Sequence, residues 1–444
     1  MRLIDVKTQK LETRKLEDFT SGTLSYAILS HTWGAEEITF DGMKTKPDKQ
    51  KAGWRKIDLS CKQAKEDGYD YVWCDTCCID KNSSAELSES INSMFRWYQE
   101  AEKCYAFLED IQEVEELTKA KWFTRGWTLQ ELIAPKSLVF YVSCDTTWRE
   151  IGTREEATMA KKIAGITGID ESFLRGVDST GHVHGASFAK RVAWAADRKT
   201  ERKEDIAYCL MGLLDVNMPL LYGEGGVKAF RRLQEEYLKV HPDQSFLAWL
   251  LPSGDEEPRT TSDGNLLAGH PDDFRKCKRI SLASDDAAPF TLNNKGLQIR
   301  LPLYQNRSVD AKRSPEYFAV LACYSDAQPE YRIRMPLCAV ERSAETLSFL
   351  PSSQHHPVST DEFDNARLTN CFILRTPPPL TPRLLSVNGL SELISWKPKI
   401  VYLNPSTGTW DCLSKPGDLD PSILRPELWG PSSSSVSILG QYEQ

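Results

Sequence analysis

The sequence predicts an α/β protein with a doubly wound, mainly parallel sheet, then a helical segment and a C-terminal antiparallel β domain. Two observations lead to this fold class. Between residues 25 and 142, short apolar segments alternate with segments of helical periodicity, as in strands joined by crossover helices. Beyond about residue 255, short runs rich in β-branched and aromatic residues are separated by Pro, Asn, Asp and Ser clusters, which is typical of antiparallel strands.

The first two strands and the helix between them follow from local pattern. We expect "YAILS" (26–30) to be a buried strand, because it is apolar and short. The following helix places Ile57, Cys61 and Ala64 on one face and stops at Gly68. The second buried strand lies in "YDYVWCDTCCID" (69–80).

The next helix opens with a capping box. Ser83 precedes Glu86 by three residues, and this spacing satisfies the first free N–H groups of a helix. "CYAFLED" (104–110) is then the third strand, residues 127–133 form a short helix closed by Pro135, and "SLVFYV" (137–142) is the fourth strand. Residues 150–245 are mainly helical in pattern, and "GEGG" (223–226) lacks the Lys-Ser/Thr of a phosphate-binding loop, which indicates a turn.

Composition excludes some classes of function. The 444 residues carry a net charge of -8, which disfavours nucleic acid as the main partner because phosphate binding requires a basic face. There is no apolar run of the about 18 residues needed to span a bilayer, and no signal-peptide core in the first 20 residues. We therefore expect a cytoplasmic protein without a membrane span, whose 12 cysteines are reduced.

Three cysteines in "WCDTCC" raise the question of a metal. Cys74, Cys77 and Cys78 contain one C-x-x-C pair, whereas a structural zinc site needs four ligands, commonly from two such pairs. No second pair is present, so the sequence predicts no metal site. We expect Cys74 to pack in the core and Asp75 to face the ligand-binding edge of the sheet.

Two further segments carry candidate functional residues. Ser30 and His31 end the first strand, but neighbouring strand residues point in opposite directions and no G-x-S-x-G elbow exists, which disfavours a serine hydrolase. In "WFTRGWTLQEL" (122–132), Trp127 and Glu131 are four residues apart and share a helix face. Glu131 could be an acid with a raised pKa beside an aromatic ring, or a structural partner of Arg125.

Four ordered motifs together resemble the fungal heterokaryon-incompatibility (HET) domain. They are "AILSHTWG", "YVWCDTCCIDK", the Ser83 helix running into "MFRWYQEAEKCYAFLED", and "WFTRGWTLQELIAP". The resemblance covers roughly residues 1–195, and "EDIAYCLMGLLDVNMPLLYGEGGVKAFRRLQEEYLK" resembles the helical segment that follows in many fungal members. We therefore expect a HET domain at 1–195, a helical segment at 196–250 and a β-rich domain at 255–444.

The resemblance implies self/non-self recognition with regulated cell death as its output. HET domains are also regarded as remote relatives of TIR domains, which have a flavodoxin-like sheet and, where enzymatic, cleave NAD with a Glu in a W-C-x-x-E helix. In this sequence Trp127 and Glu131 match that motif, and Thr128 replaces the Cys. The likeness implies Glu131 as catalytic carboxylate, with a substrate-binding set of Ser30, His31, Trp33, Gly34, Asp75, Arg125 and Trp127.

No cofactor is implied, and NAD or a related nucleotide is the expected substrate. The alternative is a non-catalytic HET signalling module that acts through self-association and protein partners. Under this alternative His31 caps a loop and Trp33 covers the sheet edge. A homo-oligomer or a signalling protein is the expected partner in either case.

Overall fold

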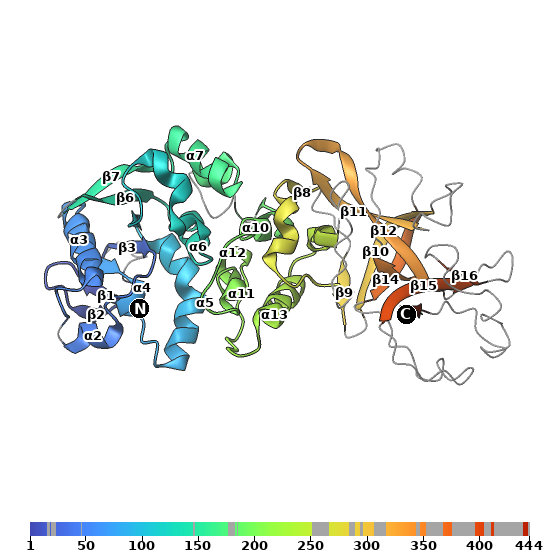
Figure 1. Ribbon diagram of the computed structural model, residues 1–444, viewed down its shortest axis with the longest axis horizontal. Helices are drawn as coiled ribbons and strands as arrows, with labels where there is room; N and C mark the ends of the chain where they lie inside the picture. The colour runs from blue at the N-terminus through green and yellow to red at the C-terminus, as the bar shows by residue number, and fades with distance from the viewer. Residues whose placement is uncertain are drawn as a thin grey trace. The chain divides into compact units, whose positions relative to one another are not determined.

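The computed structural model describes most of the N-terminal half of the chain and the strands of the C-terminal half (Figure 1). The residues it describes are 1–15, 18, 24–45, 47–144, 147–175, 183, 185–250, 266–283, 289–293, 296–305, 317–342, 347–351, 367–374, 396–403, 410–412 and 438–442. They divide into two compact units, residues 1–239 with 269–278, and residues 240–268 with 279–444.

The first unit contains a mixed sheet of seven strands in the order β2-β1-β4-β3-β5-β6-β7. The three central pairings, β4–β3, β3–β5 and β5–β6, are parallel. The outer pairings β2–β1, β1–β4 and β6–β7 are antiparallel. The strands are β1 (Arg2–Asp5), β2 (Leu11–Thr13), β3 (Tyr26–His31), β4 (Tyr71–Trp73), β5 (Lys103–Leu108), β6 (Leu138–Cys144) and β7 (Thr147–Thr153).

Helices cover both faces of this sheet. Figure 1 shows α3 (Ala52–Glu66) on one side and α5 (Ser84–Glu100) and α6 (Thr128–Ile133) on the other. Two of these helices have the features that the sequence predicted. Ile57, Cys61 and Ala64 of α3 are buried, and the Ser83 hydroxyl accepts a hydrogen bond from Glu86 N at the start of α5. The other elements here are α2 (Phe40–Thr45), α4 (Asp75–Cys78), η1 (Val114–Lys119) and η2 (Lys121–Thr124).

The strand order fixes where a ligand site is expected. The chain leaves β3 for β4 on one side and then crosses back to β5 on the other side. In chain order the parallel strands therefore read second, first, third, fourth, which is the flavodoxin-like order. Ligands of such sheets bind at the carboxyl ends of the strands where this order reverses, and His31 is the last residue of β3.

The helical part of the first unit follows β7 and packs against α5. Gly212 lies in α12, and a Cβ at this position would overlap the Phe95 side chain of α5, so glycine allows the two helices to approach closely. The predicted "GEGG" turn wraps around Glu204, whose Oε1 accepts hydrogen bonds from Gly223 N and Gly225 N at 2.9 Å each. The helices are α7 (Ala157–Thr167), α8 (Glu171–Arg175), α10 (Phe188–Ala193), α11 (Asp205–Tyr208), α12 (Met211–Leu214) and α13 (Gly226–Leu238).

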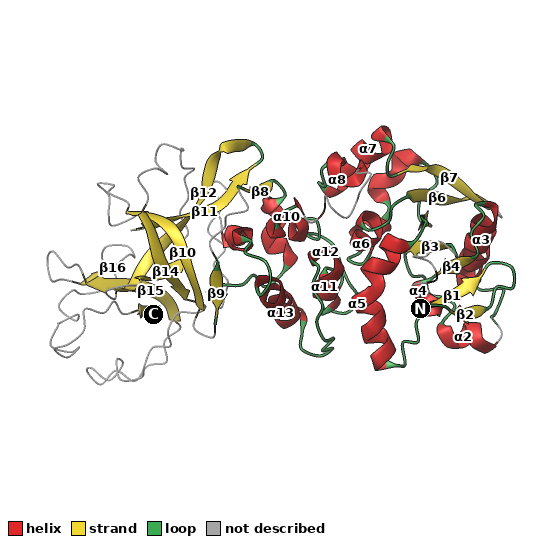
Figure 2. Cartoon of the chain, turned by 180° about the vertical axis from the view of Figure 1, so that it is seen from behind, coloured by secondary structure: helices red, strands yellow, loops and turns green. Residues whose placement is uncertain are grey.

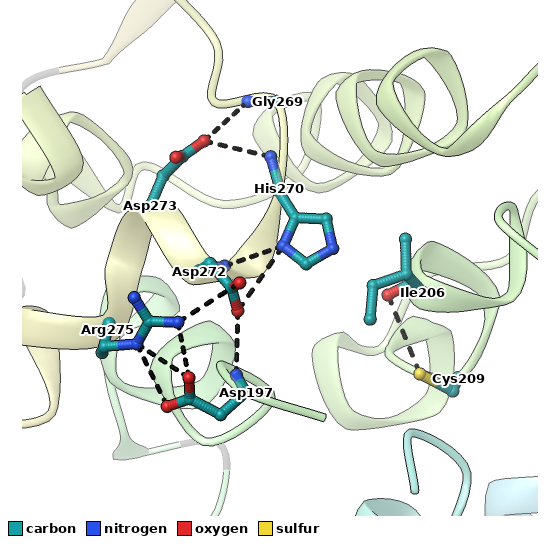
Figure 3. Close-up of polar contacts among 8 residues, drawn as sticks. All are labelled: Asp197, Ile206, Cys209, Gly269, His270, Asp272, Asp273 and Arg275. Carbon is teal, nitrogen blue, oxygen red and sulfur yellow. Dashed lines mark hydrogen bonds and ion pairs between the residues drawn. The ribbon is translucent and has the colours of Figure 1, made fainter. Parts of the chain in front are cut away.

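A short segment, residues 269–278, belongs to the first unit although it lies later in the chain. It contains the 3-10 helix η4 (Pro271–Cys277), capped by His270 and Asp273. Figure 3 shows Arg275 reaching Asp197, with Arg275 Nε 2.9 Å from Asp197 Oδ1. Phe274 packs against Phe188 of α10, with ring centroids 5.6 Å apart. These contacts attach the segment to the helices before it.

The second unit is dominated by strands (Figure 2). Five of them pair in a closed circle, β10–β11–β12–β13–β14–β10, in which only β13–β14 is parallel. A further antiparallel sheet has the order β16-β15-β17. The elements are η3 (Gln244–Leu250), β8 (Ile280–Leu282), β9 (Phe290–Leu292), β10 (Gly296–Gln305), β11 (Tyr317–Ser325), β12 (Gln328–Arg342), β13 (Leu347–Pro351), β14 (Arg367–Leu374), β15 (Trp396–Leu403), β16 (Trp410–Cys412) and β17 (Ile438–Tyr442).

The predicted α/β class and the separate antiparallel sheet are confirmed. The N-terminal sheet is mixed rather than mainly parallel, because β1, β2 and β7 add antiparallel pairings at its edges. The helical residues up to 239 belong to the same compact unit as the α/β part. The domain boundaries at 195 and 250 and the likeness to TIR domains stay predictions. Among the described residues, no helix is both long and apolar enough to cross a membrane.

Candidate active site

Glu131 lies buried beneath the carboxyl end of β3, although it is 101 residues away from Ser30 of that strand in the chain. The Ser30 hydroxyl of β3 donates a hydrogen bond to Glu131 Oε2. The same hydroxyl accepts a hydrogen bond from Trp122 Nε1 at 2.8 Å. Glu131 is only 7% exposed, so this serine is the link that connects its carboxylate to the sheet.

The short helix α6, which carries Glu131, is held at both ends by buried polar groups. At its start, Thr128 donates to the Trp122 carbonyl, and Arg198 donates to Thr128 Oγ1 at 3.1 Å and to the Arg125 carbonyl at 2.9 Å. At its end, Arg154 Nη1 donates to the Leu132 carbonyl at 2.7 Å. Since a helix of this length has little stability of its own, these contacts fix the position of Glu131.

Burial changes the acidity of Glu131. Desolvation raises the pKa of its carboxyl group to about 7, with a smaller increase from Asp75, while the hydrogen bond from Ser30 and the charge of His31 oppose the shift. A carboxyl group with this pKa changes protonation state near neutral pH. Such groups are common in active sites.

His31 ends β3 and points away from Ser30, as the alternation of strand residues requires. Its Nε2 lies 3.5 Å from Glu37 Oε2, and Lys56 Nζ holds the other Glu37 oxygen at 2.7 Å. Burial alone would lower the pKa of His31, but Glu37, Cys74 and Asp75 together raise it to about 9. These neighbours therefore favour the protonated form of the His31 imidazole.

Trp33 and Asp75 form the outer lip of the site. Trp33 Nε1 donates to Asp75 Oδ2 at 2.8 Å, and Lys81 Nζ lies 3.4 Å from the centroid of the Trp33 ring. Trp33 remains 39% exposed. The lip thus combines an exposed aromatic ring, a carboxylate and a cation.

These side chains surround a cavity of about 220 Å³. Five predicted site residues line it together with Glu131, and the remaining walls come from α5, from the segment 201–222, and from Ile79, Lys81 and Thr128. The lining residues are His31, Trp33, Asp75, Ile79, Lys81, Leu87, Ile91, Met94, Arg125, Trp127, Thr128, Glu131, Glu201, Arg202, Asp205 and Tyr222.

Three predicted residues take positions other than those expected. Ser30 is fully buried and absent from the cavity lining, and it contacts Glu131 instead. Arg125 does not pair with Glu131: its guanidinium lies 3.3 Å from Glu201 Oε1, because Arg125 precedes α6 at the cavity rim while Glu131 points into the interior. Gly34 is absent from the cavity lining, and its N–H donates to Glu37 Oε1 at 2.8 Å. Trp127 does line the cavity, and its Nε1 lies 3.4 Å from Asp205 Oδ2.

Several residues that build the site were missed from the sequence. Trp122 and Arg198 act through long-range hydrogen bonds, and no local pattern reveals such partners. Arg202 and Tyr222 lie in a segment read only as helix and turn, and here the Arg202 guanidinium stacks 4.2 Å from the centroid of the Tyr222 ring. The isolated bridge between Arg125 and Lys199 brings that segment to the cavity.

Comparison with known proteins identifies part of the chain. The family model described as "Heterokaryon incompatibility protein (HET)" matches residues 26–114. The chain carries a HET domain. A second model, a domain of unknown function (DUF8212), matches residues 228–302. No solved structure matches the chain.

A curated relative agrees with the HET assignment. The chain is 42% identical over 285 residues to "Vegetative incompatibility protein HET-E-1" of Podospora anserina, an alignment that covers 60% of this chain. The aligned region is only 20% of that relative, so the chain spans about a fifth of its length. The HET model match includes Ser30, His31 and Asp75 but ends before Glu131.

Proposed function

We propose that the chain is an effector of heterokaryon incompatibility and regulated cell death, and that its cavity cleaves the nicotinamide–ribose bond of NAD or a related dinucleotide. The observation that carries the proposal is Glu131, a buried carboxyl group bound to Ser30 at the carboxyl end of β3. The HET domain and the relative HET-E-1 support the biological role. The flavodoxin-like order of the parallel strands supports the likeness to TIR domains.

The cavity lining suits a nucleotide. Lys81, Arg125 and Arg202 supply cations for phosphate groups, and Trp33, Trp127 and Tyr222 supply aromatic surface. The volume of about 220 Å³ is below the about 300–1,000 Å³ usual for ligand pockets. We therefore assign the cavity to the nicotinamide riboside half, and the diphosphate to the rim where Arg125 and Arg202 lie.

The chemistry requires the ionised form of Glu131, a carboxylate, rather than its protonated form acting as a general acid. As the bond to ribose breaks, its electron pair moves to the pyridinium nitrogen and nicotinamide leaves as a neutral molecule. The ribose develops oxocarbenium character, which a carboxylate beside it stabilises. Water then adds to C1′ and loses a proton to Glu131 or to solvent, so that NAD and water give nicotinamide, ADP-ribose and one proton.

The substrate itself helps Glu131 to ionise. Desolvation raises the pKa of Glu131 to about 7 in the free protein. The nicotinamide ring of NAD carries a positive charge, and an opposite charge close to a carboxyl group lowers its pKa. In the complex the Ser30 hydroxyl and the pyridinium ring together favour the charged form of Glu131.

Release of nicotinamide from NAD by the purified full chain tests this proposal. The chain is assayed dilute and then clustered through a fused oligomerisation tag, with nicotinamide and ADP-ribose measured by chromatography. We expect equal amounts of the two products, at least from the clustered chain. If a folded, clustered chain releases neither product, the chain is a non-catalytic signalling module that acts by self-association.

A further inference from the structure

Three side chains with metal-binding atoms meet where β3 and β4 end. His31 is the last residue of β3, Cys74 follows β4, and Asp75 begins α4. A ring nitrogen of His31, the sulfur of Cys74 and a carboxylate oxygen of Asp75 all lie within 4.8 Å of one another. His31 and Cys74 are buried, whereas Asp75 is partly exposed at the cavity, so the cluster is closed on its inner side and open on its outer side.

We propose that His31, Cys74 and Asp75 form a zinc-binding site, which the sequence did not predict. A thiolate, an imidazole and a carboxylate are all zinc ligands, and the thiolate disfavours Mg²⁺ and Ca²⁺. Zinc–ligand bonds of about 2.0–2.3 Å place the ligand atoms of a tetrahedral ion about 3.5 Å apart. Side-chain rotations that move the ligand atoms by about 1 Å therefore bring these three atoms to a common ion.

The residues around the cluster already occupy the positions of outer partners. A zinc-bound histidine usually gives its other N–H to a carboxylate, and Glu37 Oε2 lies 3.5 Å from His31 Nε2. We therefore assign Nδ1 to the ion. In the described part of the chain, His31 Nε2 lies at ion-pair distance from Glu37 but has no hydrogen bond of good geometry.

A neighbouring side chain also orients Asp75. Trp33 Nε1 binds its Oδ2 at 2.8 Å, which leaves Oδ1 for the ion. Three protein ligands leave a fourth position, as in catalytic rather than structural zinc sites. His31 and Asp75 both line the cavity, so this fourth position belongs to water or to an atom of a cavity ligand. Zinc binding does not depend on cleavage of NAD.

Metal titration of the chelator-treated full chain tests the site. Zn²⁺ binding is measured by calorimetry, and Co²⁺ is used as a spectroscopic probe because a thiolate ligand gives a cobalt charge-transfer band. We expect one ion per chain and a cobalt–thiolate band in the wild type. Both are lost in Cys74→Ala, and Glu37→Gln weakens zinc binding about tenfold through the outer partner. Cys277→Ala, a buried cysteine outside the cluster, is the matched control and keeps both signals.

Two results would overturn the proposal. The first is a wild type that binds Zn²⁺ no more tightly than His31→Asn and Cys74→Ala do. The second is binding that survives both substitutions but is lost in Cys77→Ala or Cys78→Ala, because the neighbouring thiols would then be the ligands. Circular dichroism of each variant excludes unfolding as the cause of lost binding, and none of these readouts uses NAD.

Discussion

The Ser30 hydroxyl donates a hydrogen bond to Glu131 Oε2 and accepts one from Trp122 Nε1. One strand residue thereby connects the catalytic candidate to the sheet and to the segment before α6. The bond stabilises the charged form of Glu131, whereas burial stabilises the neutral form. The balance of these two effects sets the pH range in which the proposed chemistry operates.

NAD cleavage by the clustered chain should depend on pH through Glu131. The active form is the carboxylate, and the pKa of Glu131 is raised to about 7. We therefore expect kcat/KM to increase as pH rises through about 7 and then to level off, because this parameter reports groups of the free enzyme. Steady-state rates between pH 5 and 9 measure it, and a profile that is flat or falls with pH across this range contradicts the role of Glu131.

Ser30→Ala should shift that profile and weaken the fold. Without the serine hydrogen bond the pKa of Glu131 rises further, so the midpoint of kcat/KM moves to higher pH. Trp122 Nε1 also loses its acceptor, which costs about 1–3 kcal/mol of unfolding free energy. Urea denaturation and pH profiles measure the two effects. Ser60→Ala is the control, because Ser60 is a buried serine that bonds within α3; an equal midpoint shift in both variants would reject the specific role of Ser30.

Glu131→Gln should affect stability differently at low and high pH. A folded-state pKa raised from 4.5 to about 7 means that the folded protein retains a proton the unfolded chain has lost. Wild-type stability therefore falls as pH rises between these values, by about 3 kcal/mol at most, whereas glutamine does not titrate. In urea denaturation we therefore expect the unfolding free energy of the variant, relative to that of the wild type, to be higher at pH 8 than at pH 5. The same stability difference at both pH values would show that Glu131 is not shifted.

Close packing of the helical segment on α5 gives a prediction about two glycines. An added methyl group in Gly212→Ala would overlap Phe95, so we expect the unfolding free energy to fall by about 1–3 kcal/mol. Gly165 lies inside α7 with open space around it. Gly165→Ala should therefore raise the unfolding free energy by about 0.5–1 kcal/mol, because alanine has the higher helix propensity. Thermal denaturation compares the two, and equal effects would mean that α12 does not pack tightly on α5.

Much of the fold could be predicted because local patterns determine it. The four parallel strands have clear apolar runs, and the Ser83 cap starts α5 as expected. Strands β1 and β2 were missed because they are short and lie in a charged segment. β7 was missed because its alternation is weak and only partly buried. Strands at or next to the edge of a sheet, such as these, are determined by their neighbours more than by their own residues.

The candidate site was predicted in outline but not in its connections. His31, Trp33, Asp75, Trp127 and Glu131 do line one cavity, since the ends of parallel strands meet at one edge of the sheet. The ion-pair partner of Arg125 could not be predicted from the strand pattern. Arg125 was considered as a partner of Glu131 because the two are close in sequence, but its partner is Glu201, brought near by the pairing of residues 125 and 199.

The most direct test of the proposed function compares nicotinamide release by the clustered wild type, Glu131→Gln and Glu116→Gln. Glu116 is an acidic residue that pairs with Lys119 on the surface, and its substitution controls for the loss of one negative charge. We predict release by the wild type and Glu116→Gln, and at least a 100-fold lower rate in folded Glu131→Gln. Release that persists in folded Glu131→Gln would contradict the assignment of Glu131 as the catalytic carboxylate.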